Sequence, residues 1–234
     1  MNRNTTHPSE CPDVAQRDAM IGIFDLGDGR QRGTRDPFGK QFLDYVLGTA
    51  ALLFFAPLLL IIAVAIKLDS PGPVLFRQKR RGLNNQPFMV FKFRSMYVHL
   101  SDIEASRQTT RNDPRVTRVG KWLRRLSLDE LPQLLNVLRR EMSLVGPRPH
   151  ALNMRIEGEL LDVASGDYLL RYSVKPGITG WAQVNGVRGE VVRLEDLRKR
   201  IEYDLEYIRR WSVRFDLKIL FLTATREIIS KNAF

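Results

Sequence analysis

Two adjacent carboxylates, Asp129 and Glu130, are the residues of this chain whose types and spacing best suit chemistry. Arg124 and Arg125 come shortly before them, and Arg148 follows between two prolines. Carboxylates beside guanidinium groups suit a site that handles a divalent metal ion and a phosphate ester together, because the metal screens the acids while the guanidinium groups hold phosphate oxygens. The pattern indicates metal-dependent chemistry on a phosphorylated substrate, with Asp129 and Glu130 as the candidate metal ligands.

A purely structural explanation of the acidic pair is also open. Ser127 and Glu130 have the spacing of a capping box, and Asp129 would favour the positive end of a helix dipole. Pro132 fits poorly with Ser127 as the N-cap, because the proline would fall in the second turn, where its missing N–H should be bonded. With Asp129 as the N-cap the proline falls in the first turn, where that N–H is not needed. The local rules therefore explain neither acid fully.

Composition limits the classes of protein that the chain can represent. Its 234 residues suffice for one sizeable domain with appendages, and the net charge of +11 points to an anionic partner, either nucleic acid, an acidic lipid surface or phosphorylated substrates. The single cysteine, Cys11, excludes an internal disulfide. The three histidines, His7, His99 and His150, are scattered, which argues against a histidine-based metal site or triad.

The N-terminal region changes abruptly from polar to apolar. Residues 1–34 lack apolar periodicity, which predicts a disordered tail. Residues 45–66 carry no charge and are long enough as a helix to cross the ~30 Å hydrocarbon core of a membrane. We therefore expect a membrane helix within residues 35–68, followed by a single cytoplasmic domain over residues 69–234.

The topology of this membrane helix has two solutions. Pro57 lies near the middle of the apolar run and predicts a kink, because proline removes a backbone hydrogen bond and clashes with the preceding turn. Basic residues flank both ends of the run, with Lys40 before it and Arg77 among those after it, so both ends favour the cytoplasmic side. A re-entrant helix that bends at Pro57 satisfies both flanks. A kinked helix that spans the membrane is the alternative.

A strand-like segment carries the next candidate binding residues. Residues 88–94 alternate well enough for a strand, with Lys92 and Arg94 on one face. These cations suit phosphate binding, but a solvated strand edge protected from aggregation by lysine explains them equally well.

The rest of the chain is mainly helical in pattern. Residues 113–126 form an amphipathic basic segment suited to lipid headgroups or substrate phosphates, and the last 40 residues are helical and partly apolar, suited to the membrane interface. Between them, residues 174–186 indicate a Pro-Gly turn and then a short strand with Gln183 and Asn185 on one side. The overall expectation is an α+β protein, mainly helical with a small sheet.

Five motifs in order carry a resemblance to a known family. They are Lys92–Met96, Ser127–Gln133, Ser143–Pro149, Lys175–Gly186, and Tyr203-Asp204 with Asp216–Lys218. Together, after an apolar segment, they resemble the bacterial sugar transferase family, the small monotopic phosphoglycosyl transferases that start capsule and exopolysaccharide assembly. The resemblance covers about residues 36–234.

The resemblance implies a reaction and a role for each site residue. A UDP-sugar would give its sugar 1-phosphate to polyprenyl (undecaprenyl) phosphate and release UMP, with Mg²⁺ required. Asp129 matches the family's nucleophile, which forms a covalent phosphosugar intermediate, and Glu130 would bind the metal or activate the incoming phosphate. The residues that would hold phosphates and nucleotide are Arg148, Lys92, Arg94, Arg125, Gln183 and Asn185.

The resemblance also implies a location and a topology. Family members anchor in the bacterial inner membrane through a re-entrant helix broken at a proline, with the catalytic domain on the cytoplasmic face and in contact with membrane lipids. The usual serine before that proline is absent, because Ala56 precedes Pro57 here. Arg148-Pro149-His150-Ala151 resembles the branch that transfers hexose 1-phosphate, so glucose or galactose is the expected sugar.

Two other classes of function compete with this interpretation. A nucleic-acid binder is suggested only by the net charge, and the cations flank the apolar segment instead of interleaving with aromatic residues, so no nucleic-acid partner is expected. A non-catalytic membrane scaffold of a polysaccharide assembly complex is the second rival, and the intact acidic pair argues against it. The oligomeric state stays open between a monomer and a homodimer.

Overall fold

The computed structural model describes residues 38–101, 113–152, 154–156, 159–160, 166–187 and 193–229, all within the unit Thr34–Phe234. The expected disordered tail, residues 1–34, lies outside the described residues and stays a prediction. In chain order the elements are α2 (Phe38–Asp69), β1 (Leu75–Arg81), η1 (Leu83–Asn85), β2 (Pro87–Phe93), η2 (Val98–Leu100), α3 (Arg118–Arg125), η3 (Leu128–Gln133), α4 (Leu134–Leu138), β3 (Ser143–Val145), β4 (Arg155–Ile156), β5 (Glu159–Leu160), η4 (Gly166–Ser173), β6 (Gly177–Thr179), α6 (Trp181–Val184), α7 (Leu194–Arg210) and α8 (Val213–Ile229), where η denotes a 3₁₀ helix. This mixture of helices with small sheets confirms the predicted α+β class.

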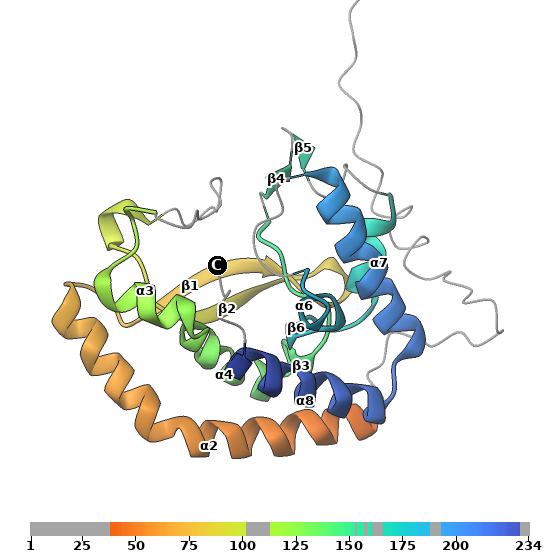
Figure 1. Cartoon of the computed structure of the whole chain (residues 1–234), viewed down its shortest axis with the longest axis horizontal. Coiled ribbons are helices and arrows are strands. Elements are labelled where there is room, and N and C mark those ends of the chain that lie inside the picture. Colours follow the sequence, from red (N-terminus) through yellow and green to blue (C-terminus); the bar gives the residue numbers. More distant parts are fainter. Residues whose placement is uncertain are drawn as a thin grey trace, which may run out of the picture. The chain divides into compact units, whose positions relative to one another are not determined.

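The longest element is α2, which contains the whole apolar run and Pro57. It is one helix of 32 residues, long and apolar enough to cross a membrane, with a mean hydropathy of 2.7 over 18 residues. Its two halves run in different directions (Figure 1). A proline inside a helix removes one hydrogen bond and pushes the preceding turn aside, which accounts for a bend without ending the helix.

The two halves of α2 pack on different parts of the core. Before Pro57, Leu47, Ala51 and Leu52 pack on a cluster that includes α4, β3 and α8. After Pro57, Ile62 and Ile66 join a second cluster. That second cluster also contains Phe93 of β2, Leu123 of α3 and Leu128, which directly precedes the acidic pair. α2 therefore contacts the core on both sides of Pro57. η3 connects α3, which packs on the second half of α2, to α4, which packs on the first half.

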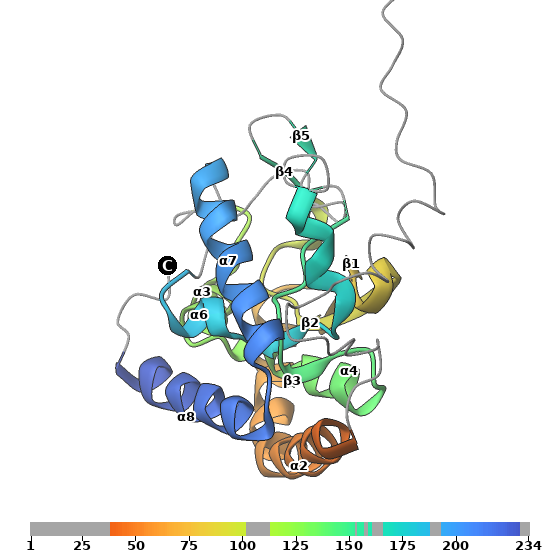
Figure 2. The ribbon, with the colours of Figure 1, turned by 90° about the vertical axis from the view of Figure 1, so that its right-hand side faces the viewer.

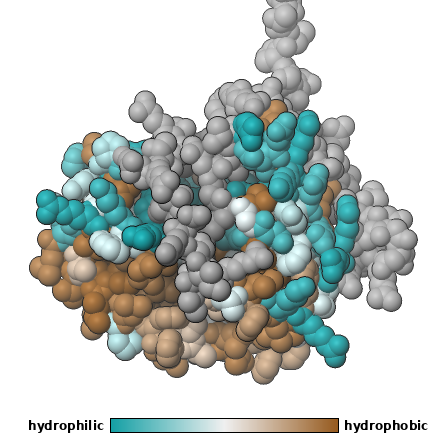
Figure 3. Space-filling model, in the orientation of Figure 1, coloured by the Kyte–Doolittle hydropathy of each residue, from teal (hydrophilic) through white to brown (hydrophobic). Residues whose placement is uncertain are grey.

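One side of this unit is strongly apolar. The large exposed apolar side chains of α2, α3, α4 and α8, which we call the apolar face, include Phe42, Leu53, Phe54, Leu60, Ile61, Trp122, Leu135, Leu217 and Phe221. In both ribbon views α2 and α8 lie along this same side, and the space-filling view shows it as a continuous hydrophobic band opposite a hydrophilic surface (Figures 1, 2 and 3). An exposed apolar surface of this extent marks a membrane or protein contact.

The sheets are small and each has two strands. β1 and β2 form an antiparallel hairpin in which Leu75 pairs with Phe93, so the predicted strand over residues 88–94 is confirmed within one residue at each end. β3 and β6 pair in parallel. Their backbones come so close that a Cβ on Gly177 would lie 2.0 Å from the backbone nitrogen of Gly146, which requires glycine there. This contact holds the start of the Gly146–Pro149 segment against the core.

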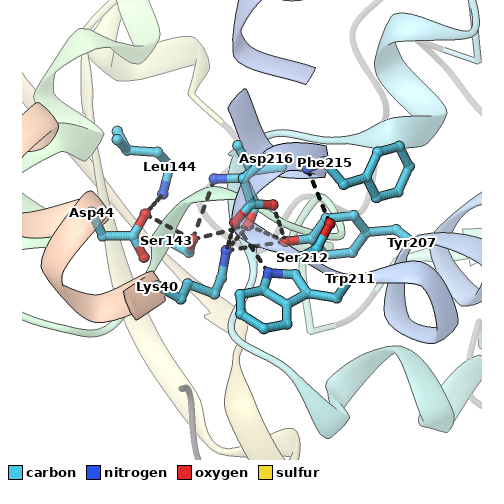
Figure 4. A network of polar contacts seen from close by, with 10 residues as sticks. Lys40, Asp44, Ser143, Leu144, Tyr207, Trp211, Ser212, Phe215 and Asp216 are labelled. Carbon is cyan, nitrogen blue, oxygen red and sulfur yellow. Dashed lines mark hydrogen bonds and ion pairs between the residues drawn. The ribbon is translucent and has the colours of Figure 1, made fainter. Parts of the chain in front are cut away.

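A buried polar network anchors the start of α2 to the rest of the unit (Figure 4). The Lys40 ammonium group, 3% exposed, donates to Asp216 Oδ2 at 2.8 Å, to the Tyr207 hydroxyl at 3.0 Å and to the Val145 carbonyl at 3.0 Å. One turn later, Asp44 accepts hydrogen bonds from β3. Because a buried charge is stable only when it is paired, this network fixes the first half of α2 to α8 and β3.

Candidate active site

Glu130 lies at the centre of a tight group of charges. Its Oε1 accepts a hydrogen bond from Lys92 Nζ at 2.6 Å, and its two oxygens accept from both terminal nitrogens of Arg148, with Arg148 Nη1 2.9 Å from Oε2. Lys92 comes from β2 and Arg148 from the segment after β3, so three separate elements converge here. The structure thus brings together Lys92, Glu130 and Arg148, as the predicted site requires.

The capping explanation of the acidic pair is wrong. Ser127 adopts a left-handed conformation with φ of 55° and its side chain makes no capping hydrogen bond. Glu130 uses its carboxylate on Lys92 and Arg148 instead, and the segment that follows Ser127 begins as a 3₁₀ helix. Ion pairs with Lys92 and Arg148, and not capping of a helix end, explain the position of the Glu130 side chain.

The environment shifts the pKa values of the two carboxylates in opposite directions. Burial alone would raise the pKa of Glu130, but the charges and hydrogen bonds of Arg148 and Lys92 outweigh it and hold that pKa well below its ordinary value. Burial raises the pKa of Asp129, and the Glu130 charge adds to the rise, although Lys92 and Arg124 oppose it. Glu130 is therefore ionised at neutral pH and neutralised by its two cations, whereas burial and the Glu130 charge disfavour ionisation of Asp129.

Arg124 lies in the last turn of α3, one residue before the predicted Arg125. The charges of Arg124 and Arg148 both lower the pKa of Asp129, and burial lowers the pKa of Arg124 itself. Arg125 is exposed, with its guanidinium carbon 5.6 Å from the centroid of Trp122. Successive residues of a helix point about 100° apart, so neighbours at the end of α3 face different surroundings. A substrate role for Arg125 stays a prediction.

Arg94 lies at the end of the membrane helix. Its guanidinium donates to the carbonyls of Pro71 at 2.8 Å and Ser70 at 2.6 Å, and to the carbonyl of Ile66 at 3.3 Å. The side chain is 3% exposed, and its bonds to Ser70 and Pro71 fix the two residues that directly follow α2. The structure does not bring Arg94 to Glu130, because Lys92 lies within β2 while Arg94 follows its last residue.

The prediction that Gln183 and Asn185 lie on a short strand is wrong. Residues Trp181–Val184 form a single helical turn, α6, directly after β6. Gln183 donates to the Ile178 carbonyl at 3.3 Å and Asn185 to the Trp181 carbonyl at 2.8 Å. Both amides thus brace their own loop, and a role in nucleotide binding stays a prediction for them.

The carboxylates of Asp129 and Glu130 are ligands of the kind that Mg²⁺ prefers. Among the described residues no group of three or more His, Cys, Asp or Glu side chains forms a ready-made metal cluster. Mg²⁺ is usually held by one or two carboxylates, with waters and substrate phosphates completing its six ligands. Asp129 and Glu130 offer those carboxylates, so the residues suit a metal that arrives with a diphosphate.

Comparison with known proteins identifies the class. The chain belongs to the bacterial sugar transferase family, whose sequence model matches residues 35–230. It is 61% identical over 199 residues to the undecaprenyl-phosphate glucose phosphotransferase of Komagataeibacter xylinus and 55% identical over 195 residues to the UDP-glucose:undecaprenyl-phosphate glucose-1-phosphate transferase of Escherichia coli. These matches cover 85% and 83% of this chain but only 37% and 41% of those relatives.

A shorter relative matches over most of its length. The UDP-glucose:undecaprenyl-phosphate glucose-1-phosphate transferase of Caulobacter vibrioides is 46% identical over 220 residues, which cover 90% of this chain and 81% of that protein. The family resemblance read from the sequence motifs is therefore confirmed.

Proposed function

We propose that this protein transfers glucose 1-phosphate from UDP-glucose to undecaprenyl phosphate and releases UMP, with UDP-galactose as the alternative donor. The observation that carries the proposal is the convergence of Lys92 and Arg148 on Glu130, the residue next to Asp129. The names of the three relatives above support the choice of glucose and of the lipid acceptor. In the cell this would be the first membrane step of exopolysaccharide synthesis.

The chemistry proceeds in two displacements at one phosphorus atom. An Asp129 oxygen attacks the phosphorus that carries the sugar, a bond from Asp129 to phosphorus forms, and the bond to the UMP oxygen breaks. An oxygen of undecaprenyl phosphate then attacks the same phosphorus, and the bond to Asp129 breaks, which regenerates the carboxylate. Splitting the transfer in this way is an established use of a carboxylate nucleophile.

The neighbouring residues would hold the phosphate oxygens during both steps. Arg148 presents two donors in one plane and Lys92 presents an ammonium group, and these are the groups that bind phosphate well. Glu130 fixes both cations beside Asp129 before substrate arrives, so little reorganisation is needed. Asp129 and Glu130 would hold Mg²⁺, which would supply charge neutralisation for the phosphates that otherwise repel the nucleophile.

The reaction should depend on both the metal and the donor. Purified protein with Mg²⁺, UDP-glucose and undecaprenyl phosphate is expected to release UMP, to stop when EDTA is added and to recover when Mg²⁺ is restored in excess. A coupled assay for UMP measures this, with UDP-galactose and UDP-N-acetylhexosamines as competing donors. Tight binding to a polysaccharide-assembly protein without any UMP release from these donors would favour the scaffold instead.

We further propose that α2 is re-entrant, with both ends on the cytoplasmic side. A straight helix of 32 residues would be about 48 Å long and would carry its ends to opposite faces of a membrane. Here Lys40 near one end binds Asp216, and Asp69 at the other end accepts from the Val119 backbone at 3.1 Å. Because both partners belong to the same unit, a spanning α2 would require that unit to occupy both sides.

Cysteine labelling tests this topology. In a Cys11→Ser background, Gly39→Cys and Pro73→Cys place single thiols at exposed positions just inside and just beyond α2. We expect a membrane-impermeant maleimide to label both in inverted membrane vesicles and neither in intact spheroplasts. Labelling of the two positions from opposite sides would establish a spanning helix.

A further inference from the structure

The segment that carries Arg148 is unusually poor in backbone donors. Pro147 and Pro149 have no N–H group, so this stretch cannot form a regular ladder on both sides of Arg148. The carbonyl of Pro147 accepts from the backbone N–H of Gly177, whereas the next two carbonyls are bound by side chains. The carbonyl of Arg148 accepts from Arg171 Nη2 at 2.9 Å, and that of Pro149 accepts from Arg80 Nη1 at 2.9 Å.

Arg171 is placed for this task by a second ion pair. Its Nε donates to Asp204 Oδ2 of α7 at 2.7 Å, and both side chains are at most 2% exposed. Replacing a buried ion pair by apolar residues is often neutral for stability. The Arg171–Asp204 pair is therefore better explained by the orientation that it gives Arg171 than by a contribution to stability. A guanidinium group holds its donors in a rigid fork. Here one nitrogen of Arg171 donates to Asp204 while another donates to the main-chain carbonyl of Arg148.

Arg171 also borders the side chain of His150, which completes the same support. His150 Nδ1 lies 2.7 Å from the Tyr168 hydroxyl and 3.2 Å from Arg171 Nη1, and its Nε2 lies 3.2 Å from Arg200 Nη1. Burial and the surrounding arginines hold the pKa of His150 well below its ordinary value, so the ring is neutral. A neutral ring has only one acceptor nitrogen, so it can accept a hydrogen bond from either Arg171 or Arg200, and these contacts, together with that to Tyr168, hold it in a fixed place between the two arginines.

We propose that Arg171 and Arg80 are positioning residues for Arg148. Arg171 of η4 and Arg80 of β1 donate to the successive carbonyls of Arg148 and Pro149. These bonds hold the Arg148 guanidinium in the bidentate geometry that it shows on Glu130. This inference rests on the proposed function, in which Arg148 holds a phosphate of the donor. Neither residue would touch substrate, because each acts through the main chain of Arg148.

A double-mutant cycle separates positioning from general stability. Arg171→Lys keeps a cation beside Asp204 but removes the fork, and we expect it to lower kcat/KM for UDP-glucose by roughly tenfold or more. In an Arg148→Lys background, where no bidentate guanidinium remains to be aligned, the same change should cost less than about threefold. A merely structural role would give the same loss in both backgrounds.

Two further variants keep the cycle decisive. Arg80→Lys, at a half-buried position, should show the same dependence on Arg148 and replaces Arg171→Lys if that variant does not fold. Arg200→Lys is the matched control, since Arg200 is buried against the same histidine and donates to the Val187 carbonyl. Its effect should multiply with that of Arg148→Lys.

The outcomes distinguish the inference from the function on which it rests. Equal losses from Arg171→Lys and Arg80→Lys in both backgrounds would overturn the positioning role while leaving the proposed reaction intact. If Arg148→Lys itself leaves kcat/KM unchanged, the phosphate-binding role of Arg148 is wrong, and the positioning role is overturned with it.

Discussion

Asp129→Asn is expected to abolish UMP release, with a loss of roughly 10³-fold or more, because an amide cannot replace the carboxylate as a nucleophile. The same substitution should leave the fold at least as stable as that of the wild type. Burial and the adjacent Glu130 raise the pKa of Asp129, so ionisation of this group costs the folded state free energy as the pH rises above the ordinary value of 3.8. Asparagine removes that cost near neutral pH.

Glu130→Gln is the matched control, and it should change stability in the opposite direction. Lys92 and Arg148 hold the pKa of Glu130 well below its ordinary value, so its ionised form stabilises the folded state at neutral pH. This contribution is lost as the pH falls through the lowered pKa. The glutamine variant lacks it at every pH and leaves two partly buried cations without their carboxylate.

Thermal unfolding and UMP release, measured on both variants at neutral pH, test this pair of expectations. An intact phosphosugar on the peptide containing Asp129, trapped with donor alone and found by mass spectrometry, would support the nucleophile directly. Near-normal turnover by Asp129→Asn, or a large loss of stability in that variant alone, would contradict the assignment.

The features that the sequence predicted well are those set by local pattern. The apolar run of α2, its bend near Pro57, strand β2 and the two C-terminal helices follow from length, periodicity and proline chemistry. The adjacency of Asp129 and Glu130 is covalent, and the prolines around Arg148 already indicated a rigid, extended segment. These parts needed no knowledge of tertiary packing.

The features that the sequence missed depend on which way a side chain points. Arg124 and Arg125 are neighbours with the same chemistry, and only the packing of α3 places the first near Asp129 and the second on Trp122. Arg94 was grouped with Lys92 because residues two apart in a strand share a face, but β2 ends at Phe93. Arg94 then turns to the end of α2.

The prediction for residues 174–186 was partly wrong for a related reason. The sequence pattern predicts a Pro-Gly turn and then a strand with Gln183 and Asn185 on one side, whereas Gly177 is needed for close backbone contact with Gly146 and a helical turn follows. The positioning arginines had no local signal in the sequence, because Arg80 and Arg171 reach the carbonyls of residues 149 and 148 only through tertiary packing.

Asp216→Asn is expected to destabilise the protein strongly, by about 3–5 kcal/mol, because it leaves the buried Lys40 charge without its acid. For a chain of this length that corresponds to a fall of about 6–20 °C in Tm. The Trp211 indole and the Tyr207 hydroxyl also donate to Asp216, so the amide would face donors that it satisfies less well. Since Lys40 lies in the first turn of α2, protease cleavage near residue 40 should rise as well.

Glu206→Gln provides a control on the same side of the fold. Glu206 pairs with Arg210 at an i,i+4 position, and such pairs contribute only about 0.5 kcal/mol or less, while the hydrogen bond that Glu206 accepts from the Trp181 indole at 2.8 Å is one that a glutamine oxygen can also accept. A second test separates an unpaired charge from lost packing: adding Lys40→Met to Asp216→Asn removes the isolated cation and should recover part of the lost Tm. If Asp216→Asn leaves Tm within the range of the Glu206 control, then the apolar contacts of Leu47, Ala51 and Leu52 alone hold the first half of α2 to the core. Recovery in the double variant would instead show that Lys40 needs an acid mainly because the fold has buried it.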